Sequence, residues 1–260
     1  MDNRMKKQLP PYLSGLIEVG VMCLPAVPAY LWMWPNLKGV QYDIFQIVVY
    51  VYILVGTLFI GLRRYRGRQL GLNRNGIWLS LGCALVLLAG RLMIILGFTW
   101  TVHPPPLTWL SLAGNLLYYF GLVGLVEELL FRGLLYRLLE DWRGVRWAIW
   151  GSSIAFIFWH IFGQGPLLGF SALLIGLLFA LLRWRGGGII GLIVLHALWD
   201  LETTLLLSGS NAEIMDLEKI TIANRGLVLL GTALLILVPV YLWKIHPLLE
   251  RLRGKRANQS

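Results

Sequence analysis

Apolar residues follow one another in long runs along this chain, and polar or charged residues bound each run. Most runs are about twenty residues long, the length at which an α-helix crosses the roughly 30 Å hydrocarbon core of a bilayer. A β-barrel would instead show alternating segments of about ten residues. The runs predict an all-α, polytopic membrane helix bundle of about eight transmembrane helices, at residues 12–34, 42–62, 76–98, 108–131, 147–162, 166–182, 188–207 and 225–243. The fifth and sixth runs are short, and turn residues Gly163–Pro166 join them as a predicted helical hairpin.

The composition supports this interpretation. Hydrophobic residues make up 57% of the chain and charged residues only 14%, against about 25% charged residues in an ordinary soluble domain. The net charge of +10 could indicate a nucleic-acid partner, but 19 of the 23 basic residues lie on one side of the predicted bundle if both termini are cytoplasmic. Cytoplasmic loops are enriched in Lys and Arg in this way. We therefore expect cytoplasmic termini, a lipid bilayer and no nucleic acid as partner, and insertion in the plasma membrane of a bacterial cell.

The sequence contains no linker or low-complexity tract, so we expect residues 1–260 to form a single membrane domain. Cys23 and Cys83 lie within apolar runs, which gives no sign of a disulfide. The basic start resembles that of a signal peptide. However, Glu18 interrupts the first run, which continues to Trp34, so we expect this segment to be retained.

Two adjacent glutamates stand at the end of the fourth run, where charged side chains are costly and usually functional. Glu128 and Arg132 are four residues apart, so they share a helix face and can pair. Glu127 points about 100° away around the helix. It is therefore not engaged by Arg132 and is the candidate general base of the site. Gly124 is expected to leave space beside Glu127 for water or a substrate backbone. The alternative is a structural ion pair with Glu127 as a bystander.

Two histidines lie in later runs, each one helical turn from another residue of interest. Phe156 and His160 share a face, and His196 and Asp200 share another, so Asp200 could orient His196 or both could face one ion. A single histidine in an apolar helix is often a hydrogen-bonded packing residue.

The same residues fit two kinds of hydrolytic chemistry. His160, His196 and Asp200 could hold zinc, which usually takes three protein ligands in a catalytic site. In a metal-free hydrolysis, Glu127 and His160 would activate water while His196 stabilises an oxyanion. The spacing leaves both open. The H-E-x-x-H, G-x-S-x-G, P-loop and dinucleotide motifs are absent from the sequence.

Taken in order, Glu127-Glu128-x-x-x-Arg132, Phe156-x-x-x-His160 and His196-x-x-x-Asp200 resemble the motifs of the CPBP family. That family comprises the CAAX-processing Rce1-type proteases and the bacteriocin-processing or immunity proteins, also called Abi proteins. The resemblance covers about residues 110–205, the expected catalytic core. It implies that Glu127 and His160 activate water, and that His196 and residue 200 hold the oxyanion.

The family has Asn or Asp at the last position, and here it is Asp200. An ionised Asp200 cannot donate a hydrogen bond, so it orients His196, stays protonated or ligates a metal.

The resemblance implies a membrane-embedded endopeptidase, either glutamate-dependent or a metalloprotease. Its substrate would be a membrane-associated peptide or protein: a prenylated CAAX-type tail, a leader peptide or a membrane anchor. One alternative is a non-proteolytic immunity or scaffold protein. Another is a proton-coupled transporter, whose usual inverted repeats the sequence lacks. The sequence leaves the oligomeric state open.

Two expectations concern how the helices meet. A minimal fourth helix would place Glu127 near the cytoplasmic end, whereas His196 lies near mid-membrane. The motifs meet only if the fourth helix is long and tilted, continuing to about Leu139 with Arg132 in a wet cavity. Glu18 and Arg91, inside the first and third runs, could form an ion pair between helices.

Overall fold

The computed structural model describes residues 9–29, 31, 36–99, 108–164, 166–207 and 222–248, and these contain helices and short connections but no strand. The described residues of every predicted run are mainly helical, so the all-α prediction is confirmed. Among the described residues, five helical stretches are long and apolar enough to cross a membrane, namely Pro11–Pro28, Val40–Arg64, Ile77–Gly97, Trp109–Arg143 and Arg225–Leu248. The number of eight spans and the cytoplasmic termini stay predictions. The end of the first run and the turn at Gly165 lie outside the described residues.

The chain divides into two compact units. The first unit comprises Met1–Asn73 and Val126–Ala180, and the second comprises Arg74–Leu125 and Leu181–Ser260. Each unit therefore contains two separate stretches of sequence, and the following description takes the units one at a time.

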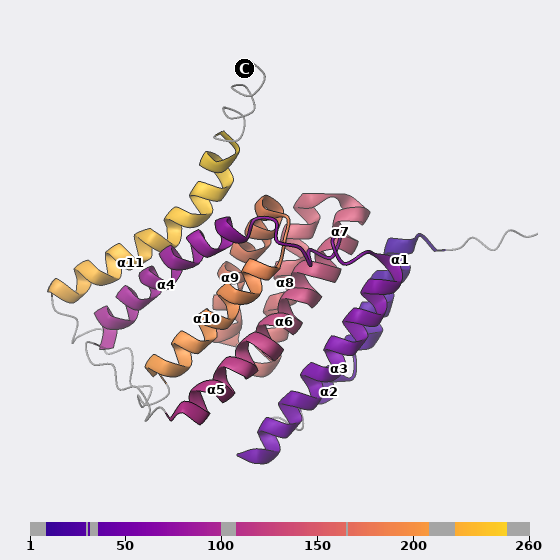
Figure 1. Ribbon diagram of the computed structural model, residues 1–260, viewed down its shortest axis with the longest axis horizontal. Coiled ribbons are helices and arrows are strands. Elements are labelled where there is room, and N and C mark those ends of the chain that lie inside the picture. The colour runs from indigo at the N-terminus through magenta and orange to yellow at the C-terminus, as the bar shows by residue number, and fades with distance from the viewer. Residues whose placement is uncertain are drawn as a thin grey trace, which may run out of the picture. The chain divides into compact units, whose positions relative to one another are not determined.

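The first unit contains the N-terminal helices and the middle of the chain. Its elements are α1 (Pro11–Cys23), α2 (Ala26–Pro28), α3 (Val40–Arg64), the π-helical segment η4 (Glu128–Leu135), α7 (Tyr136–Arg143), α8 (Val145–Gln164) and the first part of α9 (Pro166–Gly186). Helix α1 packs against α3 and α7 (Figure 1). Segment η4 packs against α3 and α8. Tyr65 directly follows α3, and its hydroxyl donates a hydrogen bond to Asp141 on α7, which ties the end of α3 to α7. Burial and this hydrogen bond raise the pKa of Tyr65. These contacts bring α3 and α8 to the two motif glutamates.

The predicted pairing of Glu18 with Arg91 is wrong. Glu18 accepts hydrogen bonds from Arg63 and Arg64 at the end of α3, at 2.7 and 2.6 Å. The reason is that α1 packs along α3, so the nearest cations to Glu18 are the two arginines that end that helix.

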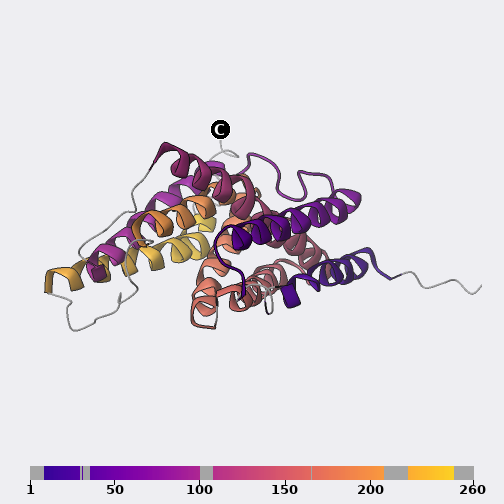
Figure 2. The ribbon, with the colours of Figure 1, turned by 90° about the horizontal axis from the view of Figure 1, so that it is seen from below.

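The second unit contains α4 (Ile77–Thr99), α5 (Trp109–Tyr118), the π-helical segment η3 (Tyr119–Val123), the last part of α9, α10 (Ile190–Leu207), α11 (Ile222–Val240) and the π-helical segment η6 (Tyr241–Ile245). Helices α4 and α11 lie side by side (Figures 1 and 2). They meet at glycines, since a Cβ added to Gly90 would lie 2.9 Å from the carbonyl oxygen of Gly231. Small residues permit this close approach of membrane helices. Helix α10 packs on α4, α5 and η3.

The fourth predicted helix is much longer than a minimal span. Segments α5, η3, α6 (Gly124–Glu127), η4 and α7 follow one another without a break from Trp109 to Arg143. The helix ends at Gly144, whose φ of 85° is left-handed and favours glycine. The predicted continuation to about Leu139 is therefore confirmed. The boundary between the two units falls within this helix, after Leu125.

Candidate active site

Glu127 lies at the junction of α6 and η4, and only 2% of the residue is exposed. Its Oε1 atom accepts a hydrogen bond of 2.6 Å from the hydroxyl of Tyr50 on α3. The same atom accepts a second hydrogen bond, of 3.1 Å, from the indole nitrogen of Trp159 on α8. Two donors from two other helices thus hold one oxygen of the carboxylate.

The second oxygen of this carboxylate faces a histidine. His160 Nε2 lies 3.9 Å from Glu127 Oε2, a separation too long for a direct hydrogen bond. His160 Nδ1 lies 2.9 Å from the carbonyl oxygen of Phe156. A carbonyl can only accept, so Nδ1 carries the hydrogen and Nε2 of the neutral ring keeps its lone pair. Two proton acceptors therefore face each other across a distance that one water molecule can bridge.

The predicted ion pair between Glu128 and Arg132 is confirmed. The Nη1 and Oε1 atoms are 3.0 Å apart, and neither side chain is exposed. Arg132 Nη2 also donates to the carbonyl oxygen of Gly176 on α9, at 3.3 Å. The guanidinium lies over the ring of Phe156, 4.2 Å from its centroid, and 5.3 Å from that of Phe179. The expected wet cavity around Arg132 is thus wrong, because aromatic rings enclose the cation and spread their negative faces toward it.

The third motif lies on α10 in the second unit. His196 Nε2 is 3.6 Å from Asp200 Oδ2, and His196 is 4% exposed. The predicted one-turn pairing of these residues is therefore present in the structure. Arg91 on α4 donates to the carbonyl oxygen of Trp199 at 2.6 Å and to the hydroxyl of Thr203. Arg91 thus holds the turn of α10 that carries Asp200. The sequence predicted instead that Arg91 pairs with Glu18.

The candidate residues divide between the units. Glu127, Glu128, Arg132 and His160 belong to the first unit, in which His160 faces the carboxylate of Glu127 and Arg132 pairs with Glu128. His196 and Asp200 belong to the second. Within the described part of the chain, no group of three or more His, Cys, Asp or Glu side chains is arranged as a metal site. Since the candidate zinc ligands come from both units, the zinc alternative stays a prediction.

Gly124 has a different role from the expected one. A Cβ added there would lie 3.0 Å from the carbonyl oxygen of Ile193 on α10 and 2.9 Å from that of Tyr119. The expected space for water or substrate is therefore filled by the backbone of α10. Glycine is required at this position because two helices approach each other closely.

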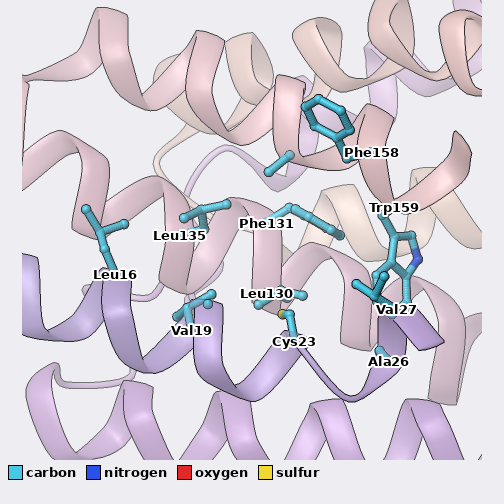
Figure 3. A pocket seen from close by; sticks show the side chains of 12 residues that line it. Leu16, Val19, Cys23, Ala26, Val27, Leu130, Phe131, Leu135, Phe158 and Trp159 are labelled. Atoms are coloured by element: carbon cyan, nitrogen blue, oxygen red, sulfur yellow. The ribbon is translucent and has the colours of Figure 1, made fainter. Parts of the chain in front are cut away.

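Trp159 also lines an apolar cavity of about 350 Å³. Val19 and Cys23 of α1, Phe131 of η4, and Phe158 and Trp159 of α8 line it together with further apolar residues (Figure 3). Charged side chains are absent from its lining. Trp159 therefore has one face on the cavity and its indole nitrogen on Glu127.

Sequence analysis missed Tyr50 and Trp159 as partners of Glu127. Trp159 directly precedes a motif histidine, which is a weak signal. Tyr50 gives no signal in the sequence, because it is one aromatic residue among many in an apolar run and lies 77 positions from Glu127.

Comparison with known proteins supports the family resemblance. Residues 109–201 match the model of a family described as type II CAAX prenyl endopeptidase Rce1-like. The matched range contains all three motifs and nearly coincides with the expected catalytic core at 110–205. No curated protein matches the chain. Over residues 109–201 the chain thus matches the Rce1-like type II CAAX prenyl endopeptidases, a family of proteases, as its three motifs predicted.

Proposed function

We propose that this protein is an intramembrane endopeptidase in which Glu127 and His160 activate the attacking water. The observation that carries the proposal is the pair of acceptor atoms, Glu127 Oε2 and His160 Nε2, which face each other at 3.9 Å. A water between them donates one hydrogen to each, which directs an oxygen lone pair outward. As the water oxygen attacks the carbonyl carbon, Glu127 takes its proton and later gives it to the leaving amine.

The tetrahedral intermediate requires a donor for its oxyanion, and we assign this role to His196. A protonated imidazole donates from both ring nitrogens. The carboxylate of Asp200, with Oδ2 3.6 Å from His196 Nε2, can hold the imidazole in its orientation. Asp200 therefore acts through His196, since an ionised carboxylate has no hydrogen to donate.

Zinc would fit the same donor set, because two imidazoles and a carboxylate form a common catalytic zinc site. His160, His196 and Asp200 would then hold the ion. When bound, it would make the water more acidic.

The apolar cavity supports a substrate that carries a hydrocarbon group. Its volume of about 350 Å³ lies in the range of roughly 300–1,000 Å³ that is typical of small-molecule sites. Its wall includes α1, part of a stretch apolar enough to cross the membrane, so a lipid group could enter from the bilayer. Among a prenylated tail, a leader peptide and a membrane anchor, the cavity favours the prenylated tail. The protein would cleave this substrate as an integral protein of the bacterial plasma membrane.

The test uses the purified protein in detergent and two fluorogenic peptides of one sequence, with and without a farnesyl group. We expect wild-type protein to cleave the farnesylated peptide faster. Glu127→Gln keeps the shape of the side chain but removes the base, so it should be inactive and still folded. Glu140→Gln is the matched control, because Glu140 lies on the same long helix in a partly exposed pair with Arg137. Full activity of folded Glu127→Gln would exclude the mechanism.

A further inference from the structure

We infer that Tyr50 is a positioning residue that directs one particular oxygen of Glu127 toward His160. The inference rests on the proposed function, because it concerns the orientation of the proposed base. Tyr50 lies on α3, outside residues 109–201, so the family match assigns it no role. Its phenol is buried and its hydroxyl lies 2.6 Å from Glu127 Oε1. This distance is typical of a charge-assisted bond from a hydroxyl to a carboxylate.

A carboxylate at the end of a Glu side chain has two equivalent oxygens and a broad terminal torsion angle. Left alone, it would present either oxygen to His160 in a range of orientations. Tyr50 and Trp159 both donate to Oε1, which removes this equivalence. Oε2 is consequently the oxygen that faces His160 Nε2.

The two donors are themselves held in place by aromatic packing. The rings of Tyr50 and Trp159 meet edge to face, with centroids 6.2 Å apart and an interplanar angle of 78°. Trp159 makes a second edge contact, also at 6.2 Å, with Phe131. Rigid neighbours of this kind keep a reacting group in its productive geometry. Tyr50 lies on the buried face of α3, together with Val49 and Ile53. Its proposed effect on the reaction is therefore exerted through the orientation of Glu127.

The test compares Tyr50→Phe with Tyr52→Phe. Both changes remove one hydroxyl from α3, but the hydroxyl of Tyr52 donates to the carbonyl oxygen of Met22 at 3.1 Å and has no role in the site. We measure kcat and KM on the farnesylated peptide, and thermal unfolding in detergent. Tyr50→Phe should lower kcat by about tenfold with KM changed by less than about twofold, as expected for loss of one bond to a charged group. Tyr52→Phe should keep the wild-type kcat.

A second pair of variants tests whether the two donors share one oxygen. Trp159→Phe removes the other donor and keeps an aromatic ring. If each donor partly compensates for the other, the double variant Tyr50→Phe/Trp159→Phe should lose more kcat than the product of the two single losses. Trp159→Phe also provides a test if Tyr50→Phe fails to fold. In that case Trp159→Phe should show the loss of about tenfold in kcat expected for Tyr50→Phe, because it too removes one donor to Glu127 Oε1.

Two results would overturn the inference. One is a wild-type kcat in folded Tyr50→Phe, and the other is an equal fall for Tyr50→Phe and Tyr52→Phe. Inactivity of Glu127→Gln together with full activity of Tyr50→Phe would refute the role of Tyr50 alone. Full activity of Glu127→Gln would refute the proposed function itself.

Discussion

Arg132 and Glu128 form an ion pair of 3.0 Å in which neither side chain is exposed. The transfer of two charges from water to such a site costs several kcal/mol per ion, and their attraction offsets this only with good geometry and further hydrogen bonds. Arg132 has both, since it also donates to Gly176 and lies over aromatic rings. Each charge of the pair is therefore stabilised in this buried position by the other, and loss of one partner leaves an uncompensated buried charge.

Removal of one partner of this ion pair should lower the free energy of unfolding more than removal of both partners. We predict that Arg132→Ala lowers the free energy of unfolding by about 3–5 kcal/mol, because Glu128 is left buried without its cation. Arg132→Met combined with Glu128→Leu should regain most of this loss, because no charge remains. Denaturant unfolding in detergent measures both.

Arg137→Ala is the control on the same helix. Arg137 pairs with Glu140 and Asp141 at 2.9 and 2.7 Å, but about a third of its side chain is exposed. Exposed pairs contribute little, so this change should cost less than about 1 kcal/mol. Equal losses for Arg132→Ala and Arg137→Ala would contradict the argument from burial.

Gly124 should tolerate no side chain. We predict that Gly124→Ala lowers the free energy of unfolding by about 1–3 kcal/mol, as overpacking commonly does. The added methyl would lie 3.0 Å from a backbone atom of α10, which cannot rotate away as a side chain can. Gly114→Ala is the control, because a Cβ at Gly114 meets nothing within 4 Å. It should stabilise the helix slightly, since alanine favours helices by about 1 kcal/mol over glycine. Similar effects of both changes would refute the close contact.

The features predictable from sequence are those set by local spacing. The helices follow from runs of apolar residues, and the pairing of Glu128 with Arg132 follows from their separation of four residues. Phe156 and His160 also share a face as predicted, with ring centroids 4.2 Å apart.

The features that sequence could not provide depend on which helices are neighbours. Hydropathy places helices in the membrane but does not order them, so the sequence predicts Arg91 as the partner of Glu18, whereas the structure pairs Glu18 with Arg64. The contact of Tyr50 with Glu127 likewise depends on the packing of α3 against η4. A glycine in a sequence shows only that a side chain is missing, and packing decides what fills the space.

The distribution of basic residues predicts the orientation of the protein in the membrane. With 19 of the 23 basic residues on one side of an eight-span arrangement, the positive-inside rule predicts cytoplasmic termini. Reporter fusions after Lys7, Asn75 and Ser260 should report the cytoplasm, and a fusion after Asn211 should report the exterior. An exterior fusion at Ser260 would contradict the eight-span arrangement.

The carboxylates of the site bear on whether a metal is needed. Glu127 Oε1 accepts two hydrogen bonds, and Glu128 is engaged with Arg132. This inventory leaves Asp200 as the carboxylate that we propose as a third zinc ligand, with His160 and His196, in a metal-dependent mechanism. It is also the one that can orient His196 in a metal-free site, at 3.6 Å.

Asp200→Asn separates these two roles. We predict that this variant keeps measurable proteolysis, because an Asn amide can donate to the oxyanion directly. We also predict that activity of the purified protein survives exhaustive chelation, since the proposed mechanism activates water through Glu127 and His160 without a metal. In a zinc enzyme the loss of the carboxylate ligand would instead reduce both bound metal and activity. Metal content by mass spectrometry, measured beside activity, decides between them. Activity lost on chelation and restored by zinc, with one zinc per chain that Asp200→Asn fails to bind, would establish the metal-dependent mechanism.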